Sequence, residues 1–201
     1  MLPGNEPLKL WKTMMNYCKI MGMDIPNTGK PQLKILETDR LILRQFTSED
    51  AGFILDLLNE PSFIHFIGDR RIRSLDGAKV YIKNGPVASY AQHGFGLYLV
   101  ELKETGDSIG MCGLIKRENL DDVDIGYAFL PAFWSKGYAV ESALAVRDFA
   151  RDVVRLKRIV AITDPQNHAS IRVLEKIGMT FEKMVKLSQD DIELRLFSIN
   201  L

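Results

Sequence analysis

Residues 126–142 read GYAFLPAFWSKGYAVES and join a strand-like run to a helix-like run. Gly126 lies inside the apolar strand, where a glycine often marks a bulge or a close backbone approach. Pro131 follows this strand and cannot donate a ladder hydrogen bond. The strand is therefore expected to leave its sheet early, so that Phe129 and Leu130 keep unpaired N–H and C=O groups. A ligand with amide groups could pair with these groups, although a plain edge strand would show the same pattern.

The second half of the stretch predicts an anion site. A helix that begins near Tyr138 leaves the N–H groups of its first turn unpaired and carries a partial positive charge there. If residues 135–140 wrap tightly at this end, their N–H groups converge on one point, which suits a phosphate. Gly137 permits a positive φ, and Lys136 adds a full charge. The pattern is neither a Walker loop nor a dinucleotide-binding fingerprint, and an ordinary strand-to-helix loop is the alternative.

The segments around this stretch predict an α/β (α+β) fold. Residues 123–163 read as strand, loop, helix and strand, which makes a βαβ crossover. Apolar runs predict further strands at residues 41–46, 96–102, 108–115, 179–187 and 192–199, and helical patterns cover residues 47–59, 74–92 and 168–177. The sum is a mixed, mainly antiparallel sheet of about seven strands, with a central βαβ crossover and helices on both faces.

Short motifs mark where the predicted helices begin and end. Thr47 and Asp50 have the spacing of a capping box, which opens the helix of residues 47–59. Pro61 is expected to stop that helix. The tripeptide at residues 84–86, Asn-Gly-Pro, is expected to break or kink the helical pattern around it.

The chain is expected to divide into two unequal parts. Residues 33–201 form one domain, whereas residues 1–32 form an N-terminal amphipathic helix followed by a linker. The broad apolar face of residues 8–21 favours packing on the main domain or on a second subunit, so a monomer and a homodimer both remain open. A membrane-surface helix is the weaker alternative, because the polar face of this segment carries few charges.

The composition argues against several classes of function. Lysine plus arginine equal aspartate plus glutamate, at 26 each among 201 residues, which gives no support to nucleic-acid or bulk membrane attraction. Cys18 and Cys112 form no CxxC pair and the histidines lack ligand spacing, so neither a disulfide framework nor a metal site is expected. No apolar run is long enough to span a bilayer, and no signal peptide is recognised. These features are typical of a cytoplasmic protein.

A second polar cluster follows the apolar strand of residues 158–163. Asn167 is placed to cap the next helix, and Ser170 lies in the first turn of that helix. Because ligands bind beyond the carboxyl ends of diverging parallel strands, Asn167 would also border a cleft at this point.

The two stretches together resemble a known family. Residues 126–142, followed by NHASIRVLEKIGM at residues 167–179, look like the GNAT superfamily of acyl-CoA N-acyltransferases. The opening LETDRLILRQF of residues 36–46 resembles the branch that includes the ribosomal-protein N-terminal (serine/alanine) acetyltransferases. The resemblance covers residues 33–201 and implies acetyl-CoA as the co-substrate, without a metal.

The resemblance implies a role for each part of the motifs. The phosphate loop of the family would be residues 134–139, with Trp134 in place of the usual glutamine or arginine. The strand residues that pair with the pantetheine arm would be Phe129 and Leu130, and Asn167 would contact that arm near its thiol. The implied cofactor-binding residues are therefore Phe129, Leu130, Ser135, Lys136, Gly137, Tyr138, Ala139, Val140 and Asn167.

The resemblance also bears on the leaving group. Many relatives place a tyrosine in the second helix as the acid that protonates the departing thiolate, and this sequence has Leu174 there. By the same resemblance, Ser170 matches a serine that this branch uses in place of the tyrosine. A serine hydroxyl is a poor acid but a good hydrogen-bond donor, so Ser170 is expected to stabilise the thiolate.

The attacking amine must be neutral, which requires a base. A lysine side chain has a pKa of ~10.4 and an α-amine a pKa of ~7.7–8.0, so an α-amine is neutral far more often near pH 7. A carboxylate can take the proton directly or through water. Asp124 matches the acidic position of this branch beside Gly126, and Glu118 in the preceding turn is the second candidate. The alternative for Asp124 is an ordinary solvent-facing strand residue.

The sequence therefore predicts an acetyl-CoA-dependent N-acetyltransferase that transfers an acetyl group directly to a primary amine. A non-catalytic acyl-CoA-binding regulatory module on the same fold is the alternative. The acceptor could be a protein N-terminal α-amine or a small molecule, such as a polyamine or an amino sugar. Residues 63–73 and 85–95 would shape its pocket, and their arginines would either meet an acidic acceptor or be ordinary surface charge.

Overall fold

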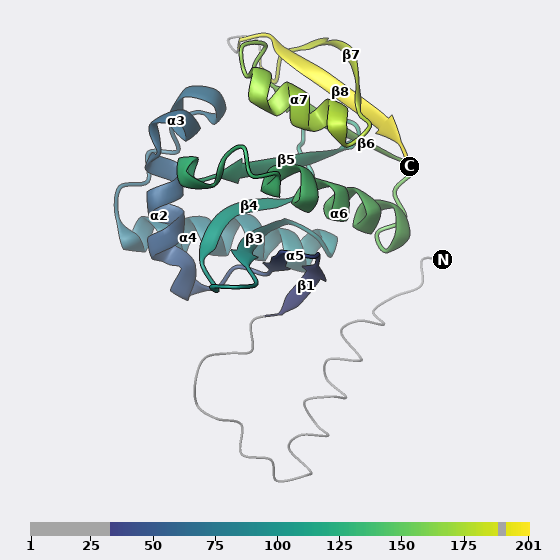
Figure 1. Cartoon of the computed structure of the whole chain (residues 1–201). Coiled ribbons are helices and arrows are strands. Elements are labelled where there is room, and N and C mark those ends of the chain that lie inside the picture. Colours follow the sequence, from purple (N-terminus) through teal and green to yellow (C-terminus); the bar gives the residue numbers. More distant parts are fainter. Residues whose placement is uncertain (1–32, 189–191) are drawn as a thin grey trace. The chain divides into compact units, whose positions relative to one another are not determined.

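An eight-stranded sheet organises the part of the chain that the computed structural model describes, residues 33–188 and 192–201 (Figure 1). The strand order is β1-β2-β3-β4-β5-β6-β8-β7, and only the β5–β6 pair in it is parallel. The strands are β1 Lys34–Glu37, β2 Leu41–Arg44, β3 Leu97–Leu102, β4 Ser108–Ile115, β5 Val123–Phe129, β6 Arg158–Thr163, β7 Thr180–Val185 and β8 Leu194–Asn200. The prediction of a mixed, mainly antiparallel sheet is confirmed.

The strand that the sequence did not reveal is β1. Its four residues, KILE, are too few to show a clear alternation of apolar and polar side chains. Pairing with β2 makes this segment a strand, since Leu36 lies opposite Leu43 across the turn between them. The sheet therefore has eight strands instead of about seven.

The parallel pair is the centre of the fold. Helix α6 (Tyr138–Asp152) connects β5 to β6, which confirms the predicted βαβ crossover. The register between the two strands covers residues 123–124 against 159–160, at the beginning of each strand. Further along, β6 stays paired with β8 through Thr163, whereas β5 stays paired with β4 through Phe129. The two strands thus separate at their carboxyl ends. Contrary to the expectation from the sequence, β5 does not leave the sheet early, because its ladder with β4 continues to its last residue.

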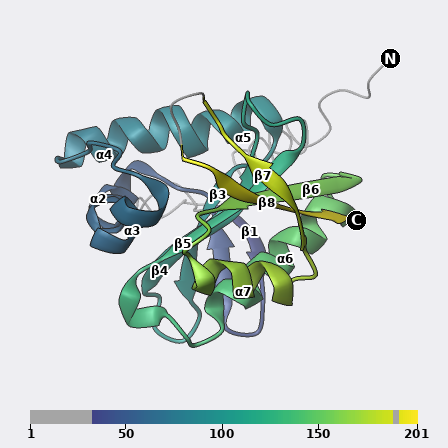
Figure 2. The ribbon, with the colours of Figure 1, turned by 90° about the horizontal axis from the view of Figure 1, so that it is seen from above.

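Helices cover both faces of the sheet. They are α2 Ala51–Asn59, α3 Pro61–Ile67, α4 Leu75–Ile82, α5 Ala88–His93, α6 and α7 His168–Lys176. Figure 2 shows α4 and α5 on one side of the sheet and α6 and α7 on the other. The adjacent residues Tyr98 and Leu99 of β3 belong to two different buried clusters, one with α6 and α7 and one with α2 and α4. This alternation follows from the period of two along a strand.

The predicted capping box forms at the start of α2. The Asp50 carboxylate accepts a hydrogen bond from the Thr47 N–H over 2.7 Å, and the Thr47 hydroxyl accepts one from the Glu49 N–H over 3.3 Å. A single 3₁₀ turn, Ser48–Asp50, then leads into the helix. The local signal was therefore sufficient to place this helix start.

Two prolines shape the helices that follow. Pro61 ends α2 as predicted, but it also occupies the first turn of α3, a helix that the sequence reasoning missed. Proline suits that position, because its missing N–H would have no acceptor in the first turn. Pro86 lies in a π-helical segment, Lys83–Val87, between α4 and α5, which confirms the predicted kink.

A buried ion cluster fixes the start of α2 against the sheet. The Arg44 guanidinium, only 4% exposed, contacts the Asp50 carboxylate at 2.8 Å and the Glu101 carboxylate at 2.7 Å. Burial alone would lower the pKa of Arg44, but its two carboxylate partners raise it above the ordinary value. The cluster ties together β2, β3 and the turn that precedes α2.

Some predictions lie beyond what the structure can address. The N-terminal helix and linker of residues 1–32 lie outside the described residues, so the domain boundary stays a prediction. Within the described part of the chain, no helix is both long and apolar enough to cross a membrane. Cys112 is fully buried in β4, and burial raises the pKa of its thiol to about 12, so it stays protonated.

Candidate functional site

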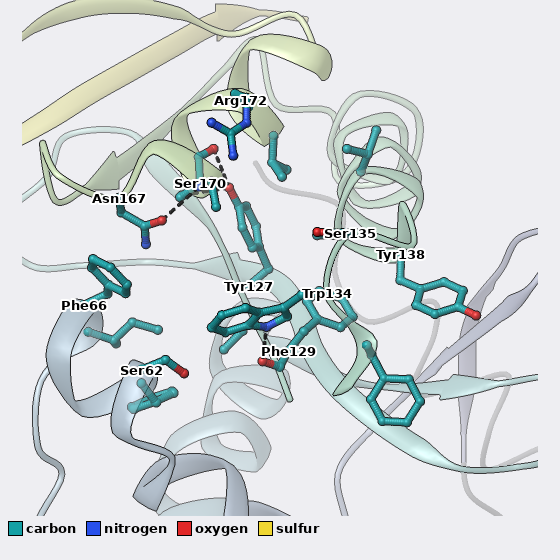
Figure 3. Close-up of a pocket in the computed structure, with 18 of the residues that line it drawn as sticks. Ser62, Phe66, Tyr127, Phe129, Trp134, Ser135, Tyr138, Asn167, Ser170 and Arg172 are labelled. Atoms are coloured by element: carbon teal, nitrogen blue, oxygen red, sulfur yellow. Dashed lines mark hydrogen bonds between the residues drawn. The ribbon is translucent and has the colours of Figure 1, made fainter. Parts of the chain in front are cut away.

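A cleft of about 660 Å³ opens where β5 and β6 separate (Figure 3). One wall comes from β5, the loop that follows it, and the first turns of α6 and α7. The opposite wall comes from α2 and α3, with Leu57, Glu60, Ser62, Phe63, Phe66 and Ile67. Eight of the twelve predicted site residues line this cleft: Phe129, Ser135, Gly137, Tyr138, Ala139, Val140, Asn167 and Ser170.

The loop before α6 has the backbone geometry of an anion cradle. Ser135 has φ +59° and Gly137 has φ +85°, so the chain turns sharply into the helix. Gly137 is the N-cap and offers no side chain to the helix end. The first intrahelical bond runs from the Glu141 N–H to the Gly137 carbonyl, which leaves the N–H groups of residues 138–140 without an intrahelical acceptor. All three residues line the cleft, so their N–H groups are candidates to stabilise an anion there.

The same helix end is fastened to the turn between β1 and β2. Arg40 contacts the Glu141 carboxylate at 2.7 Å and donates a hydrogen bond to the Lys136 carbonyl over 3.0 Å. Its guanidinium also lies 4.6 Å from the centre of the Tyr138 ring. Burial would raise the pKa of Glu141, but hydrogen bonds from Thr38 and Arg40 lower it overall. Glu141 is thus held ionised, and Arg40 fixes the loop to the turn between β1 and β2.

Lys136 lies at the margin of the cleft. Its side chain is exposed, does not line the cavity, and places its Nζ 5.3 Å from the centre of the Phe133 ring. A cation over an aromatic face is held weakly at an exposed site. Its charge adds to the local positive potential, whereas the residues of the first turn of α6 line the cleft themselves.

The end of β5 is partly as predicted. The Leu130 N–H donates to the Ile109 carbonyl over 3.0 Å, and the Leu130 carbonyl accepts from the Phe133 N–H over 2.9 Å. The expectation that Leu130 keeps both backbone groups unpaired is therefore wrong, because the β4 ladder and the turn after Pro131 use them. Leu130 also does not line the cleft.

Phe129 keeps only part of the opening that the sequence predicted for both residues. In an antiparallel ladder, alternate residues point their N–H and C=O groups to opposite sides. Since Leu130 bonds toward β4, Phe129 points its backbone groups the other way, toward the side from which β6 has separated. The Phe129 carbonyl there accepts a hydrogen bond from the Trp134 indole Nε1 over 2.7 Å, so the expectation that this carbonyl stays unpaired is wrong. Trp134 was assigned no role from the sequence beyond replacing a family residue.

The first turn of helix α7 completes the wall that β5 and α6 begin. The Asn167 side chain caps the helix, because its Oδ1 accepts a hydrogen bond from the Ser170 N–H over 3.0 Å. The Ser170 hydroxyl lies 2.9 Å from the hydroxyl of Tyr127, which reaches up from β5 (Figure 3). Leu174 is buried in the core and does not reach the cleft. Tyr127 is the polar residue that the sequence reasoning missed, and its position one residue after Gly126 was the signal that could have found it.

The two predicted bases lie outside the cleft lining. Asp124 is 1% exposed, so the solvent-facing alternative is wrong. Arg117 Nε donates to Asp124 Oδ2 over 2.6 Å, whereas Oδ1 has no hydrogen-bond partner among the described residues. Burial raises the pKa of Asp124 to about 6, although Arg117 opposes the rise. Glu118 is exposed in the turn between β4 and β5.

The segments expected to shape an acceptor pocket contribute unequally. From the first segment, Phe63, Phe66 and Ile67 line the cleft, but its arginines do not. Arg73 instead pairs with Asp69 at 2.7 Å on the surface, as ordinary surface charge does. The second segment, residues 85–95, does not line the cleft. Within the described ranges, no three His, Cys, Asp or Glu side chains gather as a metal site would require.

Comparison with known proteins identifies the family. Residues 40–180 match the family described as acetyltransferase (GNAT) domain. The chain is 33% identical over 154 residues to the Bacillus subtilis protein YkkB, and this match covers 75% of the chain and 88% of YkkB. It is 30% identical over 154 residues to the B. subtilis N-acetyltransferase YoaA, covering 76% of the chain and 86% of YoaA. The chain belongs to the GNAT acetyltransferase family, as its motifs predicted.

Solved structures agree on the fold. An acetyltransferase from Agrobacterium tumefaciens superposes with a TM-score of 0.72 at 26% identity, over 90% of this chain and all of that one. The ribosomal L7/L12 α-N-protein acetyltransferase RimL, solved with coenzyme A, superposes with a TM-score of 0.73 at 17% identity, over 84% of this chain and 98% of that one. The enzyme class is thus an acetyl-CoA-dependent N-acetyltransferase, and acetyl-CoA is the co-substrate of this class.

Proposed function

We propose that this protein transfers an acetyl group from acetyl-CoA to a primary amine by direct attack, with both substrates bound in the cleft. The observation that carries the proposal is the single cleft between the separated carboxyl ends of β5 and β6. It joins the free N–H groups of α6 at one side to the α2–α3 wall at the other. A long donor and a separate acceptor can therefore meet within one cavity.

The coenzyme would occupy the β5–α6–α7 wall. Its pyrophosphate would accept hydrogen bonds from the N–H groups of residues 138–140 at the positive end of α6. Its pantetheine arm would run beside β5 and pair with the Phe129 N–H. The thiol end would then lie near Asn167 and Ser170, at the start of α7. Lys136 would add positive charge at the margin of the cleft. Leu130 would not contact the coenzyme and would only continue the strand.

The acceptor would enter against α2 and α3. That wall is mainly apolar, with Phe63, Phe66 and Ile67, but Glu60 and Ser62 add polar groups beside them. The Glu60 carboxylate could bind an amine, and the apolar side chains around it could contact an apolar group next to that amine. The first residue of a protein can present both. A protein N-terminal α-amine and a small-molecule amine are both acceptors of this kind.

The chemical step needs a proton acceptor and a stabilised leaving group. The amine lone pair attacks the thioester carbonyl carbon, the C–N bond forms, and the C–S bond breaks with its electron pair on sulphur. Asp124 is proposed as the base because a pKa of about 6 leaves it ionised at neutral pH and still able to take a proton. Its buried position requires transfer through an intervening group, and Glu118 is the alternative base. Ser170 would stabilise the thiolate.

The proposal is tested by turnover with three acceptor classes: short peptides with a free α-amine, polyamines and amino sugars. Each is mixed with acetyl-CoA, and released thiol and N-acetylated product are measured together. We expect amine-dependent release of thiol with at least one class. Tight binding of acetyl-CoA without product in any class would instead favour a non-catalytic acyl-CoA-binding module. A cytoplasmic location is part of the proposal, because two cysteines without CxxC spacing suit a reducing compartment.

A further inference from the structure

Two hydroxyl groups meet inside the cleft from elements far apart in the sequence. The Tyr127 hydroxyl, on β5, lies 2.9 Å from Ser170 Oγ and 3.1 Å from the Ser170 carbonyl oxygen, on α7. Both residues are half-buried and both line the cavity. Figure 3 shows the Tyr127 ring rising from the strand toward the first turn of α7. The tyrosine thus links β5 to the first turn of α7, within the wall along which the coenzyme is proposed to lie.

These two contacts of the Tyr127 oxygen allow two arrangements of the hydroxyl protons. In the first arrangement, the Tyr127 hydroxyl donates to the Ser170 carbonyl, and the Ser170 hydroxyl donates to the Tyr127 oxygen. In the second, the Tyr127 hydroxyl donates to Ser170 Oγ, and the Ser170 O–H is free to point into the cleft. A hydroxyl that accepts one hydrogen bond becomes a stronger donor of the next, because hydrogen-bonded chains polarise one another.

We propose that Tyr127 is a positioning residue that turns the Ser170 hydroxyl toward the sulphur atom of the departing coenzyme. This inference rests on the proposed function, since it concerns how the thiolate of coenzyme A is stabilised as it leaves in that reaction. Tyr127 touches Ser170 and not the reacting atoms, so it acts through the serine. In this sequence the strand supplies the tyrosine, whereas the second helix carries Leu174, which is buried in the core.

The Tyr127 and Ser170 hydroxyls stabilise negative charge on the sulphur and transfer no atom in the reaction. When the C–S bond breaks, the electron pair stays on sulphur as a thiolate, and the chain Tyr127 O–H to Ser170 O–H to sulphur stabilises it. The amine gives one proton to the base, and the thiolate takes one proton to leave as the free thiol, so the protons balance. Burial raises the pKa of Tyr127, which keeps this hydroxyl a donor throughout the accessible pH range.

The test titrates the thiol of bound coenzyme A. Thiolate absorbance is followed against pH in the complex with coenzyme A, and the same titration with dethio-coenzyme A is subtracted to remove the protein's own groups. We expect the bound thiol of the wild-type protein to have a lower pKa than free coenzyme A. Tyr127→Phe and Ser170→Ala should each raise it by about one unit, a factor of ten in the equilibrium constant.

A matched control separates this effect from a loss of stability. Tyr90 has a hydroxyl that donates to the Leu97 carbonyl, and its pKa is also raised by burial, but it does not line the cleft. Tyr90→Phe should therefore cost similar stability and leave the thiol pKa unchanged. If Tyr127→Phe behaves like Tyr90→Phe, the positioning role is wrong.

Kinetics provide the second readout. Tyr127→Phe should lower kcat about tenfold with the KM for acetyl-CoA unchanged, because it removes a bond that matters when charge develops on sulphur. The double variant with Ser170→Ala should be no slower than Ser170→Ala alone, since both changes remove one device. Additive losses would overturn the inference. An enzyme that binds coenzyme A with a lowered thiol pKa but acetylates no amine would overturn the proposed function alone.

Discussion

The Trp134 indole Nε1 donates a hydrogen bond to the Phe129 carbonyl over 2.7 Å, so the loop before α6 is tied to the strand that lines the cleft. Trp134 is 48% exposed, and burial alone does not account for a tryptophan at this position. The bond fixes the distance between the last strand residue and the N–H groups of residues 138–140. The two parts that would hold the arm and the pyrophosphate of the coenzyme are thus spaced before the coenzyme arrives.

Replacement of this indole should weaken coenzyme binding. Trp134→Phe keeps an aromatic ring but removes the donor, and one lost hydrogen bond corresponds to about 1 kcal/mol, or roughly a fivefold rise in Kd. Calorimetric titration with acetyl-CoA measures this change. Val153→Ala removes an exposed apolar side chain just beyond the other end of α6 and should leave Kd unchanged. An unchanged Kd for Trp134→Phe would show that the bond does not organise the loop.

Gly137 should be essential for coenzyme binding for a geometric reason. Its φ of +85° is strained for any other residue, and an added Cβ would lie 3.2 Å from Arg40 Nη2. Gly137→Val should raise the Kd for acetyl-CoA more than about tenfold, because a β-branched residue resists this φ and crowds the N–H groups. Gly94 is the matched control, with φ +78° and nothing within 4 Å of its added Cβ. Gly94→Val should cost stability alone, and equal Kd values for both variants would contradict the cradle.

The sequence could predict the features that depend on near neighbours in the chain. The positive φ of Gly137, the cap by Asn167 and the capping box at Thr47 each follow from residues within a few positions of one another. The separation of β5 from β6 was predicted as well, but Pro131 does not mark it, because the parallel register already ends at Asp124.

The sequence could not reveal contacts that depend on the register of distant elements. Tyr127 and Ser170 are 43 residues apart and meet only because β5 and α7 border one cleft. Asp124 pairs with Arg117 and lies opposite Val160 of β6, and the pattern of one strand does not contain this information. Pro61 was read as a helix end although it also starts α3, since proline fits both positions.

Asp124 should set the acid side of the pH profile. Its pKa in the fold is about 6, above the ordinary value of 3.8, so it is protonated and inactive as a base below about pH 6. The value of kcat/KM should therefore fall as the pH drops through 6, and Asp124→Asn should remove this limb together with most of the activity. Glu118→Gln is measured in parallel. If the limb survives in Asp124→Asn and disappears in Glu118→Gln, Glu118 is the base.

Asp50 should be important for stability. It is 7% exposed and pairs with Arg44, so its removal leaves a buried guanidinium with Glu101 as its remaining carboxylate partner. Asp50→Ala should lower the free energy of unfolding by roughly 3 kcal/mol, measured by urea denaturation. Asp56→Ala, an exposed position on α2, should change it by less than about 0.5 kcal/mol. Equal effects of the two variants would show that the ion cluster does not hold α2 in place.

The central claim is that one cleft brings acetyl-CoA and an amine together for direct transfer. The most direct measurement quantifies free coenzyme A, N-acetylated amine and the mass of the intact protein in the same reaction. We expect one thiol for each acetylated amine, no acetyl group on the protein when the amine is omitted, and loss of both products in Gly137→Val. An acetylated protein that forms without amine and then passes its acetyl group on would contradict direct transfer, as would thiol release that does not depend on any amine.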